Sequence, residues 1–188
     1  MTTEIETAVR EAFPELSTID DDTLQTGVID AWVRAITDTG VDHAELDSVP
    51  WFPPEEKRLG ITGESLVDHV RDVTQGALGL CELLVDRRDQ PLSRDLVAAG
   101  ALCHDVSKLY EYEGDTPTPI GDLLGHPHYG VHVVAAAGLP VEVMHVALSH
   151  SGRTAVEPAI LEAEIVRRAD EVAAAAIRSE AVEDLRSV

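Results

Sequence analysis

The chain has few cysteines, few aromatic residues and no long apolar run. Its two cysteines, Cys81 and Cys103, form no CxxC pair and no metal-binding spacing. We interpret both as small buried side chains in a reducing compartment, and we expect a cytoplasmic protein. No basic head followed by an apolar stretch marks a secretory signal. The longest apolar run, residues 96–103, is far shorter than the roughly 20 residues that span a bilayer.

Basic residues are also scarce, with 14 against 35 acidic residues and a net charge of -21. Such a charge repels phosphate backbones and anionic lipid surfaces, so we predict no nucleic-acid partner and no membrane partner. Lysine is the rarest basic residue, present only as Lys57 and Lys108. An acidic, lysine-poor chain of this kind is typical of a salt-in halophile, where salt screens self-repulsion. An ordinary acidic mesophilic protein is the alternative.

Apolar residues recur at helical spacing, and clean alternation typical of strands is missing, so the sequence predicts an all-α fold. The pair Ser65 and Asp68 has the spacing of a capping box at the start of a helix. The stretch after Ser93 is apolar nearly all round and belongs in the centre of the protein. Helices are expected at 3–13, from 20 or 21 to about 39, 65–87, 91–103, 127–138, 140–152 and 158–187, with loops at 14–20, 40–62 and 116–119.

We predict an N-terminal helical extension with a Pro-rich loop over residues 1–61 and a helical bundle over residues 62–188. Trp51 and Phe52 lie between the prolines of that loop. Together with Trp32, these rings are expected to pack the extension on the main body. The apolar faces of the N-terminal helices could also serve a homodimer, which the sequence leaves open.

Three predicted helices each place an ionisable group on an apolar stripe. His69 and Asp170 lie among apolar residues three or four positions away, and His104 and Asp105 end the most hydrophobic helix. Burying an unpaired carboxylate costs several kcal/mol. A shared cation would offset that cost, and mixed histidine and carboxylate ligation suits a divalent first-row metal. For each histidine by itself, a hydrogen-bonded core residue is the alternative.

The order His69, His104-Asp105, Asp170 resembles the metal site of HD-domain phosphohydrolases, over residues 65–177. The stretch 102–108, with its lysine at 108, resembles the family's central motif. The resemblance implies an HD-type helical bundle and metal-dependent hydrolysis of a phosphate ester. Residues 101–114 and 139–145 are similar to small prokaryotic HD proteins that include archaeal phosphodiesterases acting on a cyclic phosphate of dihydroneopterin.

Two further stretches resemble segments that supply a second metal in this family. Residues 125–130 resemble the HPxxG stretch and point to His126, and residues 148–151 point to His150. Two-metal members often carry paired histidines at the latter place, and a GYP stretch is missing, so one and two ions remain alternatives. The implied cofactor is a divalent transition metal: Mn, Fe, Co, Ni or Zn. With two ions, Asp105 would bridge them, and a metal-activated hydroxide would attack phosphorus.

The resemblance further implies a small phosphorylated substrate, a phosphomonoester or a cyclic phosphodiester that is nucleotide-like or pterin-like. Asp105 and Lys108 are the candidate catalytic residues. Lys108 is expected to bind a phosphate oxygen, with a salt bridge to Glu111 or Asp105 as the alternative. Arg71 and Arg153 are further candidates for binding the substrate anion. For Arg71 we favour the alternative, a solvated charge on its helix, and for Arg153 both roles remain open.

Four histidines remain outside this set. His128 and His132 have a spacing that can chelate a metal, but we expect His128 to face outward. His145 is interpreted as structural or as a support for the ligands, and His43 as solvated. Two other functions compete with the enzyme: a catalytically weak HD domain that binds a nucleotide and regulates a partner, and a purely structural bundle with core histidines.

Overall fold

The computed structural model describes residues 2–187, which form an all-helical protein with one very short hairpin, as the sequence predicts. Short 3₁₀ helices cover Pro14–Thr18, His43–Ser48, Val106–Tyr110 and Leu185–Ser187. Within residues 2–187, no helix has both the length and the apolar content needed to cross a membrane. The α-helices are α1 (Thr2–Ala12), α2 (Asp22–Thr39), α3 (Pro53–Leu59), α4 (Leu66–Arg88), α5 (Arg94–Cys103), α6 (Pro119–Leu123), α7 (Gly125–Ala136), α8 (Val141–Ser149) and α9 (Leu161–Ser179).

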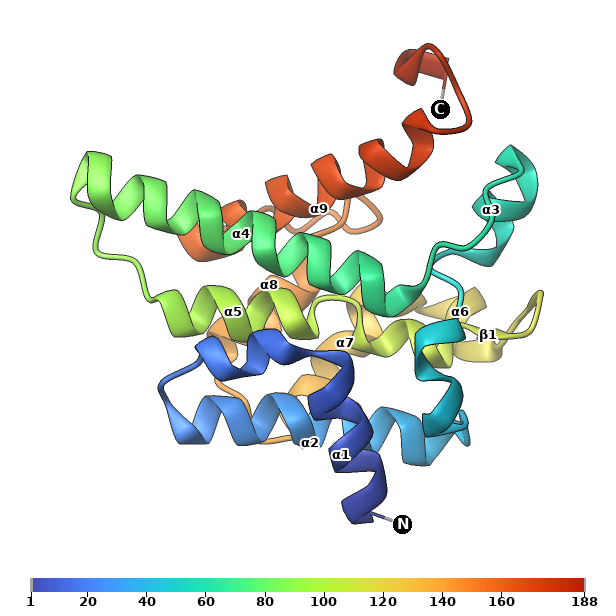
Figure 1. The fold of residues 1–188 in the computed structure, drawn as a ribbon, viewed down its shortest axis with the longest axis horizontal. Coiled ribbons are helices and arrows are strands. Elements are labelled where there is room, and N and C mark those ends of the chain that lie inside the picture. Colours follow the sequence, from blue (N-terminus) through green and yellow to red (C-terminus); the bar gives the residue numbers. More distant parts are fainter. Residues whose placement is uncertain (1, 188) are drawn as a thin grey trace.

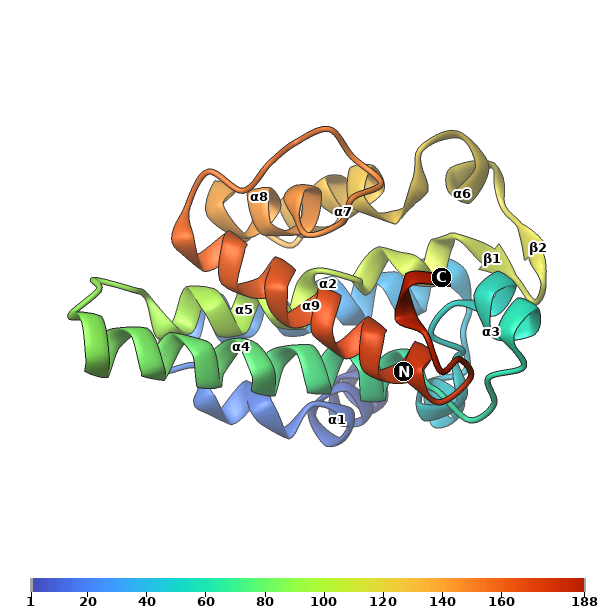
Figure 2. The same cartoon turned by 90° about the horizontal axis from the view of Figure 1, so that it is seen from above.

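Helix α5 lies at the centre of the protein, and all its residues from Val97 to Cys103 are buried. It packs against α2, α4, α8 and α9. Figure 1 shows α4 and α9 on one side of α5 and α1 with α2 on the other, and Figure 2 shows α7 and α8 on a third side. The C-terminal end of α5 is therefore surrounded by helices that come from distant parts of the sequence.

The N-terminal helices pack on the body through a shared hydrophobic core. Trp32 on α2 is fully buried, contacts the ring of Phe13, and donates its indole hydrogen to the Leu102 carbonyl at 2.9 Å. Trp51 lies elsewhere, in a smaller cluster with Ile61 and Ile177 near the end of α9. The three predicted anchor rings thus contact two different parts of the body.

Residues 40–62 contain more regular structure than the predicted loop. The 3₁₀ helix His43–Ser48 begins after Asp42, whose carboxylate accepts the Ala44 N–H at 3.0 Å. Helix α3 begins at Pro53, a residue suited to a first turn, and ends before Gly60, which has φ of 72°. Both elements are too short for a hydrophobic periodicity to reveal them. The prediction of a loop over all of residues 40–62 is therefore wrong.

The last helix is shorter at both ends than predicted. The Ala159 N–H donates to the ring of His145 at 2.8 Å instead of joining a helix that starts at Pro158. Ile160 is extended, and α9 starts at Leu161. The buried stripe ends at Ile177, and α9 ends two residues later because nothing beyond it reaches the core.

Three smaller differences lie between α5 and α9. Helix α7 starts at Gly125 rather than Pro127, and α8 ends at Ser149 rather than near residue 152. The expected loop 116–119 contains the start of α6 and part of a hairpin. That hairpin pairs β1 (Tyr112–Glu113) with β2 (Thr116–Pro117) in antiparallel register, Tyr112 opposite Pro117. Gly114 at the turn has φ of 59°, which suits glycine.

Candidate metal centre

Six side chains meet beside the end of α5; three lie on α4, α7 and α9, and three directly follow the ends of α5 and α8. They are the six that the sequence marked as metal ligands, and they fall into two groups. Within each group, the potential ligand atoms lie within 4.8 Å of one another. Five of the six residues are buried, and Asp170 is half-buried. The first group is His69, His104 and Asp170, and the second is Asp105, His126 and His150.

Asp105 lies between the histidines of the first group and those of the second, and it turns one carboxylate oxygen toward each pair. Its Oδ2 is 3.4 Å from Nε2 of His69 and 3.4 Å from Nε2 of His104. Its Oδ1 is 3.2 Å from Nε2 of His126 and 3.4 Å from Nε2 of His150. This is the arrangement needed for one carboxylate to serve two cations.

Main-chain contacts fix how the histidine rings face the centre. Nδ1 of His104 lies 2.6 Å from the Ala101 carbonyl, and Nδ1 of His150 lies 2.9 Å from the Ala147 carbonyl. A carbonyl only accepts, so each Nδ1 carries the proton and each Nε2 carries a lone pair. Nε2 of His150 lies 3.3 Å from Nε2 of His126. Nitrogens this close, with lone pairs facing inward, suit a cation between them.

Several polar atoms of the centre are buried without a hydrogen bond from any residue in the range 2–187. They include Nε2 of His69, Nε2 of His104 and Oδ1 of Asp105. Buried polar atoms rarely remain unsatisfied, because each costs free energy. Imidazole nitrogens with carboxylate oxygens form a donor set that suits divalent first-row transition metals. The residues present therefore fit such an ion.

Electrostatics keep both carboxylates of the centre ionised. Burial raises the pKa of Asp105, but the positive charge of Lys108 and the surrounding histidine rings outweigh it and hold the pKa well below its usual value. Burial likewise raises the pKa of Asp170, but the His69 ring, whose Nε2 lies 3.1 Å from Oδ1 of Asp170, together with the other nearby histidines lowers it to about 2. The His126 ring behaves oppositely, since burial lowers its pKa to about 4. Neutral imidazole beside ionised carboxylate is the state that binds metal.

Lys108 lies at the edge of the centre, on the 3₁₀ helix Val106–Tyr110 rather than on a continuation of α5. Its Nζ is 2.7 Å from Oδ2 of Asp105 and 5.1 Å from the centre of the Trp51 ring. The salt bridge to Asp105 that the sequence left as an alternative is therefore present. An ammonium group has three donors, so this bond leaves others for a ligand.

The two candidate arginines lie in different places. Nη1 of Arg153 is 3.1 Å from Oε1 of Glu111, and its guanidinium lies 5.9 Å from the Phe52 ring, so it borders the centre. Arg71 is two residues after His69, about 200° around α4. Its Nε is 3.1 Å from Oε1 of Glu15. The structure does not bring Arg71 to the centre, so its predicted substrate role has no support there.

Glu111 is a residue of the centre that the sequence did not reveal. Its side chain is 1% exposed, and its Oε1 accepts the His126 main-chain N–H at 2.7 Å. The same oxygen lies 3.1 Å from Nδ1 of His126. Glu111 thus satisfies a free N–H in the first turn of α7 and also orients the His126 ring. The sequence named Glu111 only within the 101–114 stretch and as an alternative salt-bridge partner of Lys108.

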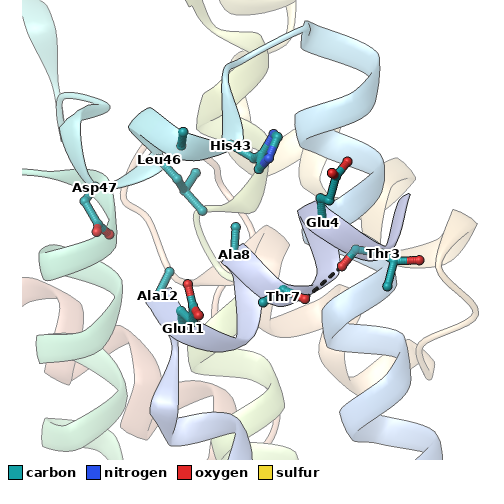
Figure 3. Close-up of a pocket in the computed structure, with 10 residues that line it drawn as sticks. Thr3, Glu4, Thr7, Ala8, Glu11, Ala12, His43, Leu46 and Asp47 are labelled. Carbon is teal, nitrogen blue, oxygen red and sulfur yellow. Dashed lines mark hydrogen bonds between the residues drawn. The ribbon is translucent and has the colours of Figure 1, made fainter. Parts of the chain in front are cut away.

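The four remaining histidines lie outside the centre. His128 and His132 are exposed, and Nδ1 of His128 contacts the Leu124 carbonyl at 3.0 Å. His145 has the structural role already described, at the start of α9. His43 borders a hollow of about 490 Å³ between α1 and the 3₁₀ helix His43–Ser48, where Figure 3 shows it together with Glu11 and Asp47. None of these four belongs to either metal group in the described part of the chain.

Comparison with known proteins adds three findings. The family model described as HD domain matches residues 66–175, a range that contains all six side chains of the centre. The dihydroneopterin 2′,3′-cyclic phosphate phosphodiesterase of Methanocaldococcus jannaschii is 32% identical over 142 residues. That match covers 72% of this chain and 54% of the relative, so it spans about half of the relative's length. No solved structure matches the chain.

Proposed function

Because the chain belongs to the HD domain family, we propose that it is a metal-dependent phosphohydrolase. The observation that carries this proposal is the position of Asp105. Its two oxygens face two separate histidine groups at 3.2–3.4 Å, each with nitrogen lone pairs turned inward. A structural bundle gains nothing from such an arrangement, since it leaves buried polar atoms unsatisfied.

The proposed substrate is a small phosphate ester, either a phosphomonoester or a cyclic phosphodiester on a pterin-like or nucleotide-like group. The cyclic ester is favoured by the relative, which is named for hydrolysing the 2′,3′-cyclic phosphate of dihydroneopterin. The net charge of -21 disfavours a polyanionic substrate such as a nucleic acid, because it would repel the approaching backbone.

The chain's own residues account for binding and charge. When bound, divalent ions supply Lewis acidity, which polarises a phosphoryl oxygen and stabilises its developing negative charge. His69, His104 and Asp170 would hold one ion, and His126 with His150 a second, with Asp105 between them. Lys108 would donate to a phosphoryl oxygen while keeping its bond to Asp105. Arg153 would attract the anion at the edge of the centre.

Metal analysis of the purified protein tests this proposal first. We expect about two transition-metal ions per chain after preparation at high salt without chelator. Asp105→Ala should lose both, since it removes the carboxylate that faces both groups. His132→Ala is the matched control, because it removes an exposed histidine outside the centre. Elemental analysis measures the outcome, followed by turnover of 2′,3′-cyclic AMP in manganese, iron, cobalt, nickel or zinc.

The possible outcomes separate the competing functions. One ion per chain would restrict the centre to His69, His104, Asp105 and Asp170. A protein that binds metal but hydrolyses no phosphate ester would favour the function of a regulatory HD domain. No metal after incubation with all five salts would refute the metal centre and return these histidines to the core.

A further inference from the structure

A hollow of about 240 Å³ opens directly beside the metal centre. Two of its lining residues, Lys108 and Glu111, also contact ligands of the centre, Asp105 and His126. The hollow is lined by Val41, by residues between 49 and 53 before and at the start of α3, and by residues between 108 and 115, which lead into the β1–β2 hairpin. Figures 1 and 2 show α3 and the hairpin close together at one end of the molecule.

The walls of this hollow are mainly apolar and aromatic. Trp51 and Pro53 come from one segment, and Leu109 and Tyr112 come from the other. The volume is below the roughly 300–1,000 Å³ of sites that enclose a drug-sized ligand. The hollow is therefore suited to one ring system rather than to a large molecule. A second hollow of about 540 Å³ is also lined by Tyr112 and Leu109.

Trp51 lines this hollow and also carries a buried polar atom. Its side chain is 3% exposed, and its indole Nε1 has no hydrogen-bond partner among residues 2–187. A buried donor without an acceptor destabilises the folded protein. Lys108, 5.1 Å from the same ring, places a phosphate-binding group next to this position.

We propose that this hollow binds a flat heteroaromatic ring of the substrate. It would thereby select phosphate esters that carry a heteroaromatic ring over esters that lack one. The ring would lie against Trp51 and Tyr112, while the ester lies at Lys108 and the metal centre. This inference rests on the proposed function for its kinetic consequence, but ring binding by itself needs neither metal nor turnover.

The kinetic test compares kcat/KM for 2′,3′-cyclic AMP with kcat/KM for glycerol 1,2-cyclic phosphate. Val41→Phe narrows the hollow that Val41 lines, and Tyr112→Ala removes one aromatic wall. Each should lower the ratio of the two kcat/KM values about tenfold or more, mainly through KM for the ring-bearing ester. The matched controls are Val172→Phe on the exposed face of α9 and Tyr129→Ala on α7, which should change the ratio less than twofold.

A binding test keeps the inference separate from the hydrolase activity. Adenosine, which has the ring but no phosphate, should quench Trp51 fluorescence saturably in the wild-type protein and more weakly in Val41→Phe. Trp51→Phe should abolish the signal, since Trp32 is buried elsewhere. If neither ester is hydrolysed, the proposed function fails and this titration still decides the role of the hollow.

Two results would overturn the inference. One is an unchanged ratio of the two kcat/KM values in Val41→Phe and Tyr112→Ala proteins that melt cooperatively, including the case in which kcat/KM falls equally for both esters. The other is the lack of saturable quenching by adenosine in the wild-type protein.

Discussion

Three donors surround one oxygen of Glu111, and this explains how a carboxylate can be ionised in the interior. Burial raises the pKa of Glu111, but hydrogen bonds and charge from His126, together with Arg153, lower it below the usual value. Nδ1 of His126 lies 3.1 Å from this carboxylate and 3.3 Å from Nη1 of Arg153; with its proton on Nδ1, the ring leaves Nε2 free for a ligand role. Glu111 is therefore coupled to the second metal group and not to the first.

Glu111→Gln should weaken metal binding at the second group and leave binding at the first group nearly unchanged. The amide keeps the size of the side chain but removes the negative charge, and loss of such a supporting carboxylate typically weakens metal binding about 10–100-fold. We expect this loss for one ion and little change for the other, measured by titration against a competing chelator. Glu113→Gln, an exposed change two residues away, is the control. Equal weakening of the affinity for both ions would show that Glu111 acts on the fold as a whole.

Lys108→Ala tests the substrate contact at the same edge. Removing a donor that meets developing charge typically costs about a hundredfold in rate. We expect kcat/KM for a cyclic phosphodiester to fall by about this factor while the metal content is retained. The control is Lys57→Ala, which removes the other lysine, an exposed residue paired with Asp115. A value of kcat/KM within twofold of the wild-type protein would mean that Lys108 only balances the charge of Asp105.

At the scale of elements, features set by local chemistry could be predicted from the sequence. Ser65 caps α4 as expected, because its hydroxyl accepts the N–H of Asp68, three residues ahead. Ser93 caps α5 in the same way, so that helix starts at Arg94 rather than at the expected residue 91. The apolar composition of residues 96–103 correctly placed α5 in the centre. The same periodicity put His69 and Asp170 on core-facing stripes. In the structure these two residues meet the other four that the sequence marked.

Features set by tertiary contacts could not be predicted in this way. The start of α9 depends on His145, which is remote in sequence from Ala159 and takes its N–H. The position of Arg71 depends on Glu15, a partner that no local pattern identifies. Glu111 looks like one acid among 35 in the sequence, and only the fold shows that it is buried against His126. These contacts join segments far apart in the chain, where hydrophobic periodicity carries no information.

At the scale of the whole molecule, charge is the dominant property. Within residues 2–187, twelve of the 14 basic residues form ion pairs, such as Arg178 with Glu55 and Arg167 with Glu157. Even one-to-one pairing would leave the net charge of -21 uncompensated. These carboxylates repel one another in the compact state and favour the expanded unfolded chain. Added salt should reduce that repulsion, because the Debye length falls from about 10 Å at 0.1 M to about 3 Å at 1 M.

The stability of the protein should therefore rise with salt concentration. A gain of 1 kcal/mol raises the Tm of a chain of this size by about 2–4 °C. Relief of several kcal/mol of repulsion should thus raise Tm by roughly 10 °C between 0.1 M and 2 M KCl, measured by differential scanning calorimetry. Sorbitol at the same osmolality is the control, since it is uncharged and cannot screen. A similar rise in sorbitol would assign the effect to solvent exclusion, because excluded solutes also stabilise folded proteins. A flat Tm in KCl would instead show an acidic surface that folds without help from salt, as in an ordinary mesophilic protein.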